Sequence, residues 1–402
     1  MNTVKKIVAV LLCGLIPASM LVGCDLSTGS TENESDWLTG VGTAGVQNSA
    51  GSSAAESNGD SDNEGDFING ILYSLSSTGT EYEVTEYDGS VSDVVIVTEY
   101  KGLPVTKIGN DVFTNSPQLT GITIPSGITE ISSYAFAGCA NLATVEIAEG
   151  VTAINFGAFQ NCTGLTRIVI PEGVTDIGDY AFQNCVSLSE ITIPNSAQNI
   201  GARILEGCNS LETLTIPSVK SYLGYYFGAD DNSGKWTHYN YPVPASLRTI
   251  ILTNCTSVPA YAFNGCTNLT SVTLPDDLTG ISEKAFYGCI SLSHIVLPEN
   301  LNNIGSDAFD SCNSLSSIVI PDSVNAIHEG AFGNCSSLSE VVIGNGVTYI
   351  GSIAFGWCTS LTSIQYNGTV AQGNTIFLTP NNWNMETPAA EVVCSDGTIP
   401  LN

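Results

Sequence analysis

The sequence predicts an α/β repeat solenoid in which each 23-residue rung contributes one short strand and returns through a short helical or 3-10 turn. The first observation is a leucine that opens each unit, with complete copies beginning at Leu119, Leu142, Leu165, Leu188, Leu269, Leu292, Leu315 and Leu338. The second is a set of nine cysteines with the same spacing, interrupted once: Cys139, Cys162, Cys185, Cys208, Cys266, Cys289, Cys312, Cys335 and Cys358. A fixed period in the low twenties indicates stacked repeats, because one such unit cannot bury its apolar face alone.

The unit at residues 165–187 shows how one rung is expected to fold. Its first six residues alternate as in a half-buried strand, so that Thr166, Arg167 and Val169 should face outward. Pro171 ends the strand, since proline cannot donate a hydrogen bond to a sheet. Successive rungs should stack at about 4.8 Å, the spacing of paired strands. The residues expected to point inward are Leu165, Ile168, Ile170, Val174, Ile177, Ala181, Phe182 and Cys185.

The N-terminus has the features of an export signal. Lys5 and Lys6 precede an apolar stretch, residues 7–21, that is too short to span a membrane comfortably. The stretch ends in Leu21-Val22-Gly23-Cys24, which resembles a bacterial lipobox; the resemblance implies cleavage before Cys24 and lipidation of its thiol. An ordinary signal peptide is the alternative. Residues 25–66 contain no Lys or Arg and few large apolar residues, so a disordered tether is expected.

The predicted organisation therefore has five parts. They are a signal peptide (1–23), a lipid anchor with a disordered acidic Ser/Gly-rich tether (24–66), an N-terminal cap (67–118), repeats with an irregular unit at 211–246 (119–360), and a C-terminal cap (361–402).

The charge of the chain limits its partners. The net charge is −29, and all 39 acidic residues follow Cys24. Nucleic acid is excluded as a partner, because neutralising phosphates requires clustered Lys and Arg. Contact with a membrane is expected only through the N-terminal lipid. The acidity favours solubility and is compatible with a basic or cation-bridged partner.

The unit pattern resembles the BspA-type leucine-rich repeat, whose 23-residue units carry an Ala-Phe-x-x-Cys signature. Residues 100–109 resemble the entry cap of that family, and Tyr366, Trp383 and the segment 393–397 resemble its exit. The resemblance implies a leucine-rich-repeat superhelix, capped at both ends, on a bacterial surface protein attached through lipid or the wall. It implies a role in adhesion or host interaction and no enzymatic activity.

Cysteine and histidine offer no clear chemistry. Equivalent cysteines in stacked rungs have parallel side chains, which favours a column of buried free thiols over disulfides, although some pairing is the alternative. Zinc sites need close pairs such as Cys-x-x-Cys, which the sequence lacks. His238, His294 and His328 are too far apart to share a site. No nucleophile elbow, phosphate loop or catalytic acid pair is recognisable, so we expect no metal, no cofactor and no catalysis.

Two surfaces remain as candidate binding sites. The first is the outer strand face, where β-branched residues either bind a ligand or only stack in the sheet; its candidates are Val169, Ile251, Val296, Val319 and Val342. The second is the irregular unit, where eight aromatic and histidine residues lie within twenty positions: Tyr222, Tyr225, Tyr226, Phe227, Trp236, His238, Tyr239 and Tyr241. These residues either form a small core of their own or expose Trp236 and Tyr239 as anchors.

The expected function is adhesion or ligand recognition at the bacterial cell surface, with a host or matrix protein bound through the repeat face. The alternative is a carbohydrate-binding component of a surface glycan-uptake system, using the aromatic irregular unit.

Overall fold

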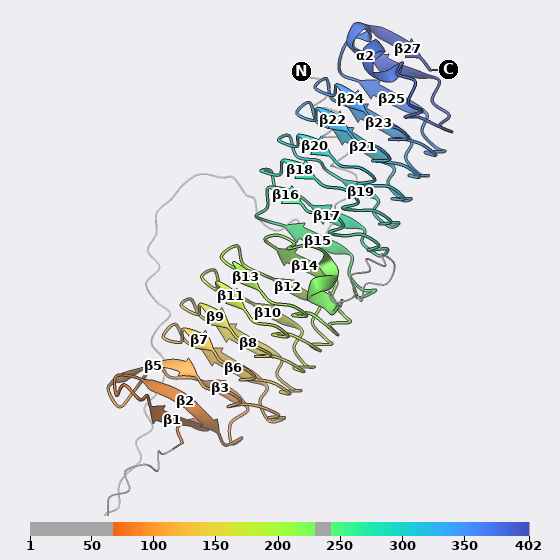
Figure 1. Cartoon of the computed structure of the whole chain (residues 1–402). Coiled ribbons are helices and arrows are strands. Elements are labelled where there is room, and N and C mark those ends of the chain that lie inside the picture. Colours follow the sequence, from red (N-terminus) through yellow and green to blue (C-terminus); the bar gives the residue numbers. More distant parts are fainter. Residues whose placement is uncertain (1–66, 230–242, 402) are drawn as a thin grey trace, which may run out of the picture. The chain divides into compact units, whose positions relative to one another are not determined.

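The computed structural model describes residues 67–229 and 243–401. The chain divides into two units, residues 1–60 and 61–402, and the described residues all belong to the second. Within this unit the rungs follow one another in sequence order from β1 to β27 (Figure 1). The parallel pairing of successive rungs confirms the predicted repeat solenoid.

Each rung places its main strand in what we call the front sheet. Neighbouring front strands pair in parallel, except between β8 and β10 and between β19 and β21, where no pairing is formed. The front strands are β3 (Asp93–Val95), β6 (Gly121–Ile124), β8 (Thr144–Ile147), β10 (Arg167–Val169), β12 (Glu190–Thr192), β14 (Thr213–Ile216), β15 (Thr249–Leu252), β17 (Ser271–Thr273), β19 (His294–Ile295), β21 (Ser317–Ile320), β23 (Glu340–Ile343) and β25 (Ser363–Tyr366).

Most rungs contain a second strand, whereas the sequence predicted one strand per rung. These strands form a back sheet that is interrupted between β13 and β16. Beyond β5 each is only two residues long, too short to show an alternating pattern. Threonines beside them, such as Thr152 and Thr175, donate a side-chain hydrogen bond to the carbonyl of the preceding rung. The back strands are β5 (Leu103–Ile108), β7 (Glu130–Ile131), β9 (Ala153–Ile154), β11 (Asp176–Ile177), β13 (Asn199–Ile200), β16 (Ser257–Val258), β18 (Gly280–Ile281), β20 (Asn303–Ile304), β22 (Ala326–Ile327) and β24 (Tyr349–Ile350).

The return segment is a series of tight turns and not a helix. In the rung of Phe136, the amides of Ala135, Ala137 and Cys139 each bond to the carbonyl three residues earlier. Two positions of this segment adopt a left-handed backbone in most rungs, for example Tyr180 (φ 59°) and Asn184 (φ 58°). Left-handed residues interrupt a right-handed helix, so the turns cannot merge into one.

Both ends of the array are closed by non-repeating elements. At the N-terminal end, β1 (Ile71–Leu75) and β2 (Tyr82–Tyr87) form an antiparallel pair that joins β5, and β4 (Glu99–Tyr100) pairs with β5 as well. At the C-terminal end lie α2 (Val370–Phe377) and the hairpin of β26 (Glu391–Cys394) and β27 (Gly397–Pro400).

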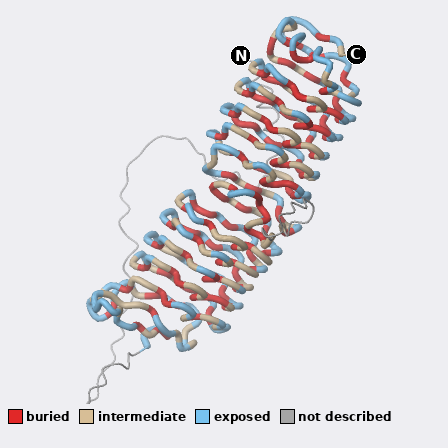
Figure 2. Tube along the Cα trace, in the orientation of Figure 1, coloured by how far each residue is buried: buried red, intermediate tan, exposed pale blue. Residues whose placement is uncertain are grey.

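The core consists of columns of identical or chemically similar residues. Every inward position predicted for the rung at residues 165–187 is at most 4 % exposed, and buried segments recur in every rung (Figure 2). The phenylalanines stack face to face from Phe113 to Phe182 and again from Phe263 to Phe355, with ring centroids 4.9–5.6 Å apart. Trp383 closes the second stack edge-on, 6.1 Å from Phe355.

Candidate functional site

The outer strand face carries the five residues predicted from the sequence, which we call the outer strand column. Val169, on β10, lies in register with Thr192 on β12, and the same register continues through β14 to Ile251 on β15. Val319 and Val342 are register partners on β21 and β23. Val169 is 57 % exposed, Val296 64 % and Val319 37 %, whereas Ile251 and Val342 are half-buried. The structure therefore places all five on one face and leaves Val169, Val296 and Val319 exposed.

Three members of this column form an apolar strip, in which Val319 and Val342 are register partners and Val296 precedes the break between β19 and β21. Val296, Val319 and Val342 occupy successive rungs, one period apart. The residues before them on the outer face are polar, namely His294, Ser317 and Glu340. An apolar strip with a polar border is the arrangement found at protein-binding surfaces.

The periodic cysteines form the expected buried column. All nine are at most 6 % exposed, and none is bridged to another. Eight of the thiols donate to the carbonyl of a phenylalanine in the preceding rung, at 2.9–3.3 Å. Burial raises the pKa of the Cys139 thiol to about 11 and that of Cys208 to about 12. A thiol that is buried and protonated is a poor nucleophile and metal ligand, so the column is a packing element.

The two histidines within the described residues have separate surroundings. His294 is exposed on β19, and His328 bonds to the Asn303 side-chain oxygen at 2.8 Å. His238 lies outside the described residues. Within residues 67–229 and 243–401, no group of three or more His, Cys, Asp or Glu side chains is arranged to hold a metal ion.

Part of the aromatic cluster of the irregular unit is buried in the core. The 3-10 helix η1 (Leu223–Phe227) replaces a return turn: its carbonyls at Tyr225 and Tyr226 accept bonds from the preceding rung, and its Leu223 amide donates to Ala262 of the next. Tyr222, Tyr226 and Phe227 are buried, whereas Tyr225 is half-buried. For these four residues a small core is therefore the better interpretation. Trp236, Tyr239 and Tyr241 lie outside the described residues.

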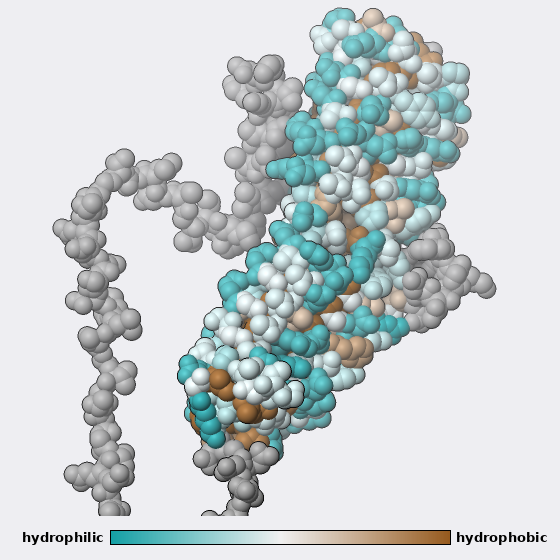
Figure 3. Space-filling model, turned by 60° about the vertical axis from the view of Figure 1, so that its left-hand side comes forward, coloured by the Kyte–Doolittle hydropathy of each residue, from teal (hydrophilic) through white to brown (hydrophobic). Residues whose placement is uncertain are grey.

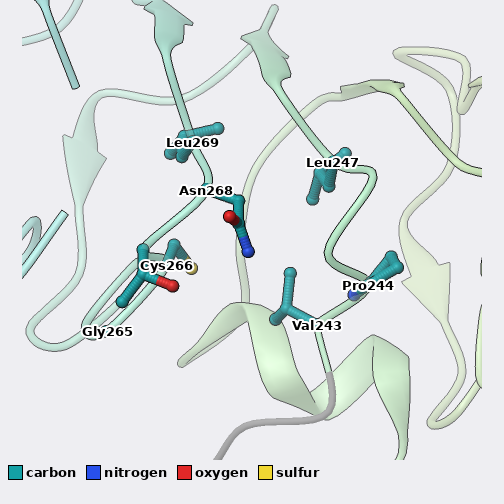
Figure 4. A pocket seen from close by; sticks show the side chains of 8 residues that line it. Val243, Pro244, Leu247, Gly265, Cys266, Asn268 and Leu269 are labelled. Carbon is teal, nitrogen blue, oxygen red and sulfur yellow. The ribbon is translucent and has the colours of Figure 1, made fainter. Parts of the chain in front are cut away.

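A small surface pocket lies where the irregular unit rejoins the array. Its space is about 340 Å³, including the open mouth, and it lies between the strand entry at Leu247 and the turn at Cys266 (Figure 4). Burial raises the pKa of the Cys266 thiol to about 12, so the pocket offers no reactive sulfur. Val243, which lines the pocket, directly follows residues outside the description, and we assign the pocket no ligand.

Sequence reasoning missed a row of partly exposed aromatic rings in the return turns. Tyr134, Phe156 and Tyr180 contact one another across three rungs, and the Arg203 guanidinium lies over the ring of Tyr180. The sequence did contain a signal for this row, because the three aromatic residues lie within one residue of the same position in successive 23-residue units. The face shown in Figure 3 is mostly hydrophilic, and hydrophobic residues gather on it only in small patches.

Two further expectations concern the N-terminus. Cys24, the signal peptide and the tether lie outside the described residues. Of the helices in the described part of the chain, none has the length and apolar character needed to cross a membrane.

Comparisons with known proteins agree with the repeat assignment. A family model for the BspA type leucine rich repeat region matches residues 106–232 and 256–380, with six copies. Among solved structures, a leucine-rich repeat protein of T. pallidum is 25 % identical over 57 % of this chain and 91 % of its own, with a TM-score of 0.39. A leucine-rich cell surface protein of Faecalibacterium prausnitzii is 28 % identical over 77 % of this chain and 96 % of its own (TM-score 0.33).

A leucine-rich repeat protein of Bacteroides ovatus is 26 % identical over 80 % of this chain and 99 % of its own (TM-score 0.34). No curated protein matches the chain. The family model covers more than half of the sequence, and its two matched ranges contain most of the rungs described above. The chain therefore belongs to the BspA-type leucine-rich-repeat family.

Proposed function

We propose that this protein is a bacterial cell-surface adhesin, which binds a host or matrix protein through the outer strand column and performs no chemistry. The observation that carries the proposal is the strip of Val296, Val319 and Val342, exposed or half-exposed in three successive rungs. A stable protein interface needs about 800 Å² from each partner. A sheet face repeated rung after rung supplies such an area, and repeat arrays commonly bind along extended faces.

The proposed location follows from the N-terminus. Lipidation at Cys24 would hold the protein at the membrane, because two acyl chains give stable anchoring. Residues 25–66 would then separate the repeats from the lipid surface. Replacing Cys24 by Ala and labelling cells with radioactive palmitate tests this part separately: label that persists in the variant contradicts the lipobox assignment.

A binding screen tests the adhesion proposal. The full chain is assayed against immobilised fibronectin, fibrinogen, laminin and collagen by surface plasmon resonance. The double variant Val296→Glu with Val319→Glu introduces charge at positions whose equivalent in another rung is already acidic, Glu146. Because buried anchors dominate interface energies, we expect at least about tenfold weaker binding.

The matched control carries the same charges on a different surface. Val186 and Ile290 are 38 % and 43 % exposed in the return turns, and Val186→Glu with Ile290→Glu should bind like the parent protein. Equal loss in both double variants would show a general effect of charge and contradict binding through the strand face. Binding that persists in the first variant contradicts it as well.

A further inference from the structure

The aromatic row consists of Tyr134, Phe156, Tyr180 and Arg203, in the turns that follow β7, β9, β11 and β13. The ring of Phe156 lies 5.3 Å from that of Tyr134 and 5.2 Å from that of Tyr180, centroid to centroid. The Arg203 guanidinium lies 5.9 Å from the centre of the Tyr180 ring. Phe156 is 37 % exposed, and both tyrosines are half-exposed. One side of three consecutive rungs thus presents connected ring surface to solvent, and Arg203 of the fourth rung extends it.

The fold does not require rings at these positions. Phe156 occupies a position that holds Ser133 in the preceding rung and Asp179 in the following one. Tyr134 and Tyr180 occupy a left-handed position, at φ 56° and 59°, where other rungs carry residues such as Asp307 and Gly330. Bulky side chains are uncommon in this conformation. The row is therefore an addition to the repeat and not part of its packing.

Gly157 makes the row continuous. It occupies the same left-handed position one rung after Tyr134. A Cβ atom there would lie only 2.8 Å from a ring carbon of Tyr134, so any side chain would displace that ring. With glycine at 157, the Tyr134 ring lies over the next rung and meets Phe156.

Polar groups border the row, and their carboxylates outnumber its one guanidinium. Arg203 is paired with Glu206 at 3.8 Å. Glu206 also accepts a 2.6 Å hydrogen bond from the Gln183 amide, and the Asn155 amide, next to Phe156, donates to Glu130. Amides and carboxylates at the edge of ring surface suit a ligand that is rich in hydroxyl groups and has apolar C–H faces.

We propose that the aromatic row binds a neutral polysaccharide of β-1,4-linked pyranose rings. Equatorial substituents leave the axial C–H groups of such sugars free to pack on aromatic faces, while their hydroxyl groups bond to the bordering amides and carboxylates. A chain of sugars laid along the row would contact several rungs at once. This site is separate from the outer strand column, and it does not depend on the adhesion proposal.

The charges argue for a neutral ligand. The only cation in the row is already paired, and the protein as a whole carries −29. An anionic glycan would be repelled at long range and would find no unpaired guanidinium in the row. A proline-rich peptide also packs on aromatic rings, and it is therefore included as a competing probe.

Affinity electrophoresis of the full chain tests the proposal. The gels contain hydroxyethylcellulose, xyloglucan, polygalacturonate or no polymer, and binding of poly-L-proline is measured by fluorescence anisotropy. The double variant Phe156→Ser with Tyr180→Asp uses residues that equivalent positions already hold, Ser133 and Asp307. Near-ultraviolet circular dichroism and the thermal midpoint establish that the variant is folded. The control, Tyr349→Asn, removes an aromatic ring that is 52 % exposed on β24, at a position equivalent to Asn303.

We expect both neutral glycans to retard the parent protein and the control, at low and high salt alike. The double variant should bind at least about tenfold more weakly, since two ring contacts are lost. Absence of retardation by the neutral glycans would overturn the proposal. Three other results would overturn it equally. The first is retardation that survives in the folded double variant, and the second is binding that requires polygalacturonate and low salt. The third is binding of poly-L-proline alone.

Discussion

The thiol column predicts that alkali unfolds this protein over a narrow pH range. Burial raises the folded-state pKa of eight column thiols: Cys139, Cys162, Cys185, Cys208, Cys266, Cys289, Cys312 and Cys335. In the unfolded chain each thiol returns to its ordinary pKa of 9.0. Above that pH the unfolded state ionises while the folded state stays protonated. The contribution of the buried thiols to the unfolding free energy is therefore fully present below about pH 8. It is lost as the pH rises from 9 towards the folded-state pKa values of these thiols.

The size of the effect follows from the number of thiols. Ionisation of each thiol in the unfolded chain lowers the unfolding free energy by about 0.4 kcal/mol at pH 9 and by about 1.4 kcal/mol at pH 10. Eight thiols together cost about 3 and about 11 kcal/mol, and the second figure is comparable to the whole stability of a typical domain. Because each rung contacts only its neighbours, the number of protons released reports how many rungs open together.

Urea titrations followed by circular dichroism at intervals from pH 7 to pH 10, with reductant present, measure this dependence. If the column opens as one unit, its thiols should contribute close to eight protons to the slope, in addition to the proton of Cys255, whose pKa burial raises to about 11. In the variant Cys289→Ala, Cys312→Ala, Cys335→Ala it should fall by three protons, although the starting stability is lower. An unfolding free energy that stays constant between pH 8 and pH 10 would refute the reasoning, because the thiols would then ionise equally in both states.

Three further predictions concern the core and the turns. Phe309→Ala should cost about 3–5 kcal/mol by urea unfolding. Phe309→Leu loses mainly the two ring contacts to Phe286 and Phe332, and it should cost about 1–3 kcal/mol. A negligible cost of Phe309→Leu would mean that stacking contributes nothing. Ile353 has a left-handed backbone (φ 49°) that β-branched residues avoid. Ile353→Asn should therefore raise the unfolding free energy by about 1 kcal/mol. A decrease of the unfolding free energy by that amount would contradict the strain argument. The column thiols should resist a thiol-labelling reagent at pH 8 until the protein is unfolded, when all of them should react; fast labelling of the folded protein would contradict burial, and silence after unfolding without reductant would indicate disulfides.

The repeat made most of the fold predictable from sequence alone. The spacing of Leu165, Ile168 and Ile170 gave the inward face of the front strand, and all three are buried. The back strands were missed because a pair such as Asp176–Ile177 is too short to carry a pattern. The return segment around Ala181 and Phe182 was expected to be a short helical or 3-10 turn. The structure shows tight turns, since residues before and after these two take a left-handed backbone.

The candidate sites were harder to predict. Exposure of Val169 and Val296 follows from strand alternation, so the outer strand column could be named in advance. The aromatic row depends on a one-residue offset between Phe156 and the tyrosines and on the absence of a side chain at Gly157. When the 23-residue units are aligned, Phe156 and the two tyrosines fall at different positions of the repeat. Only the geometry of the turns brings their rings together.

The rungs provide an internal comparison that shows where ligand specificity can lie. Inward columns are nearly constant along the chain, because each side chain must stack on an identical neighbour above and below, as Phe309 does on Phe286 and Phe332. The left-handed turn position varies freely, and from rung to rung it reads Asp111, Tyr134, Gly157, Tyr180, Arg203, Tyr261, Lys284, Asp307, Gly330 and Ile353. The family signature records only the constant columns. The ligands that we propose would contact variable, outward positions. Membership in the family therefore fixes the scaffold of this protein and does not by itself identify a ligand.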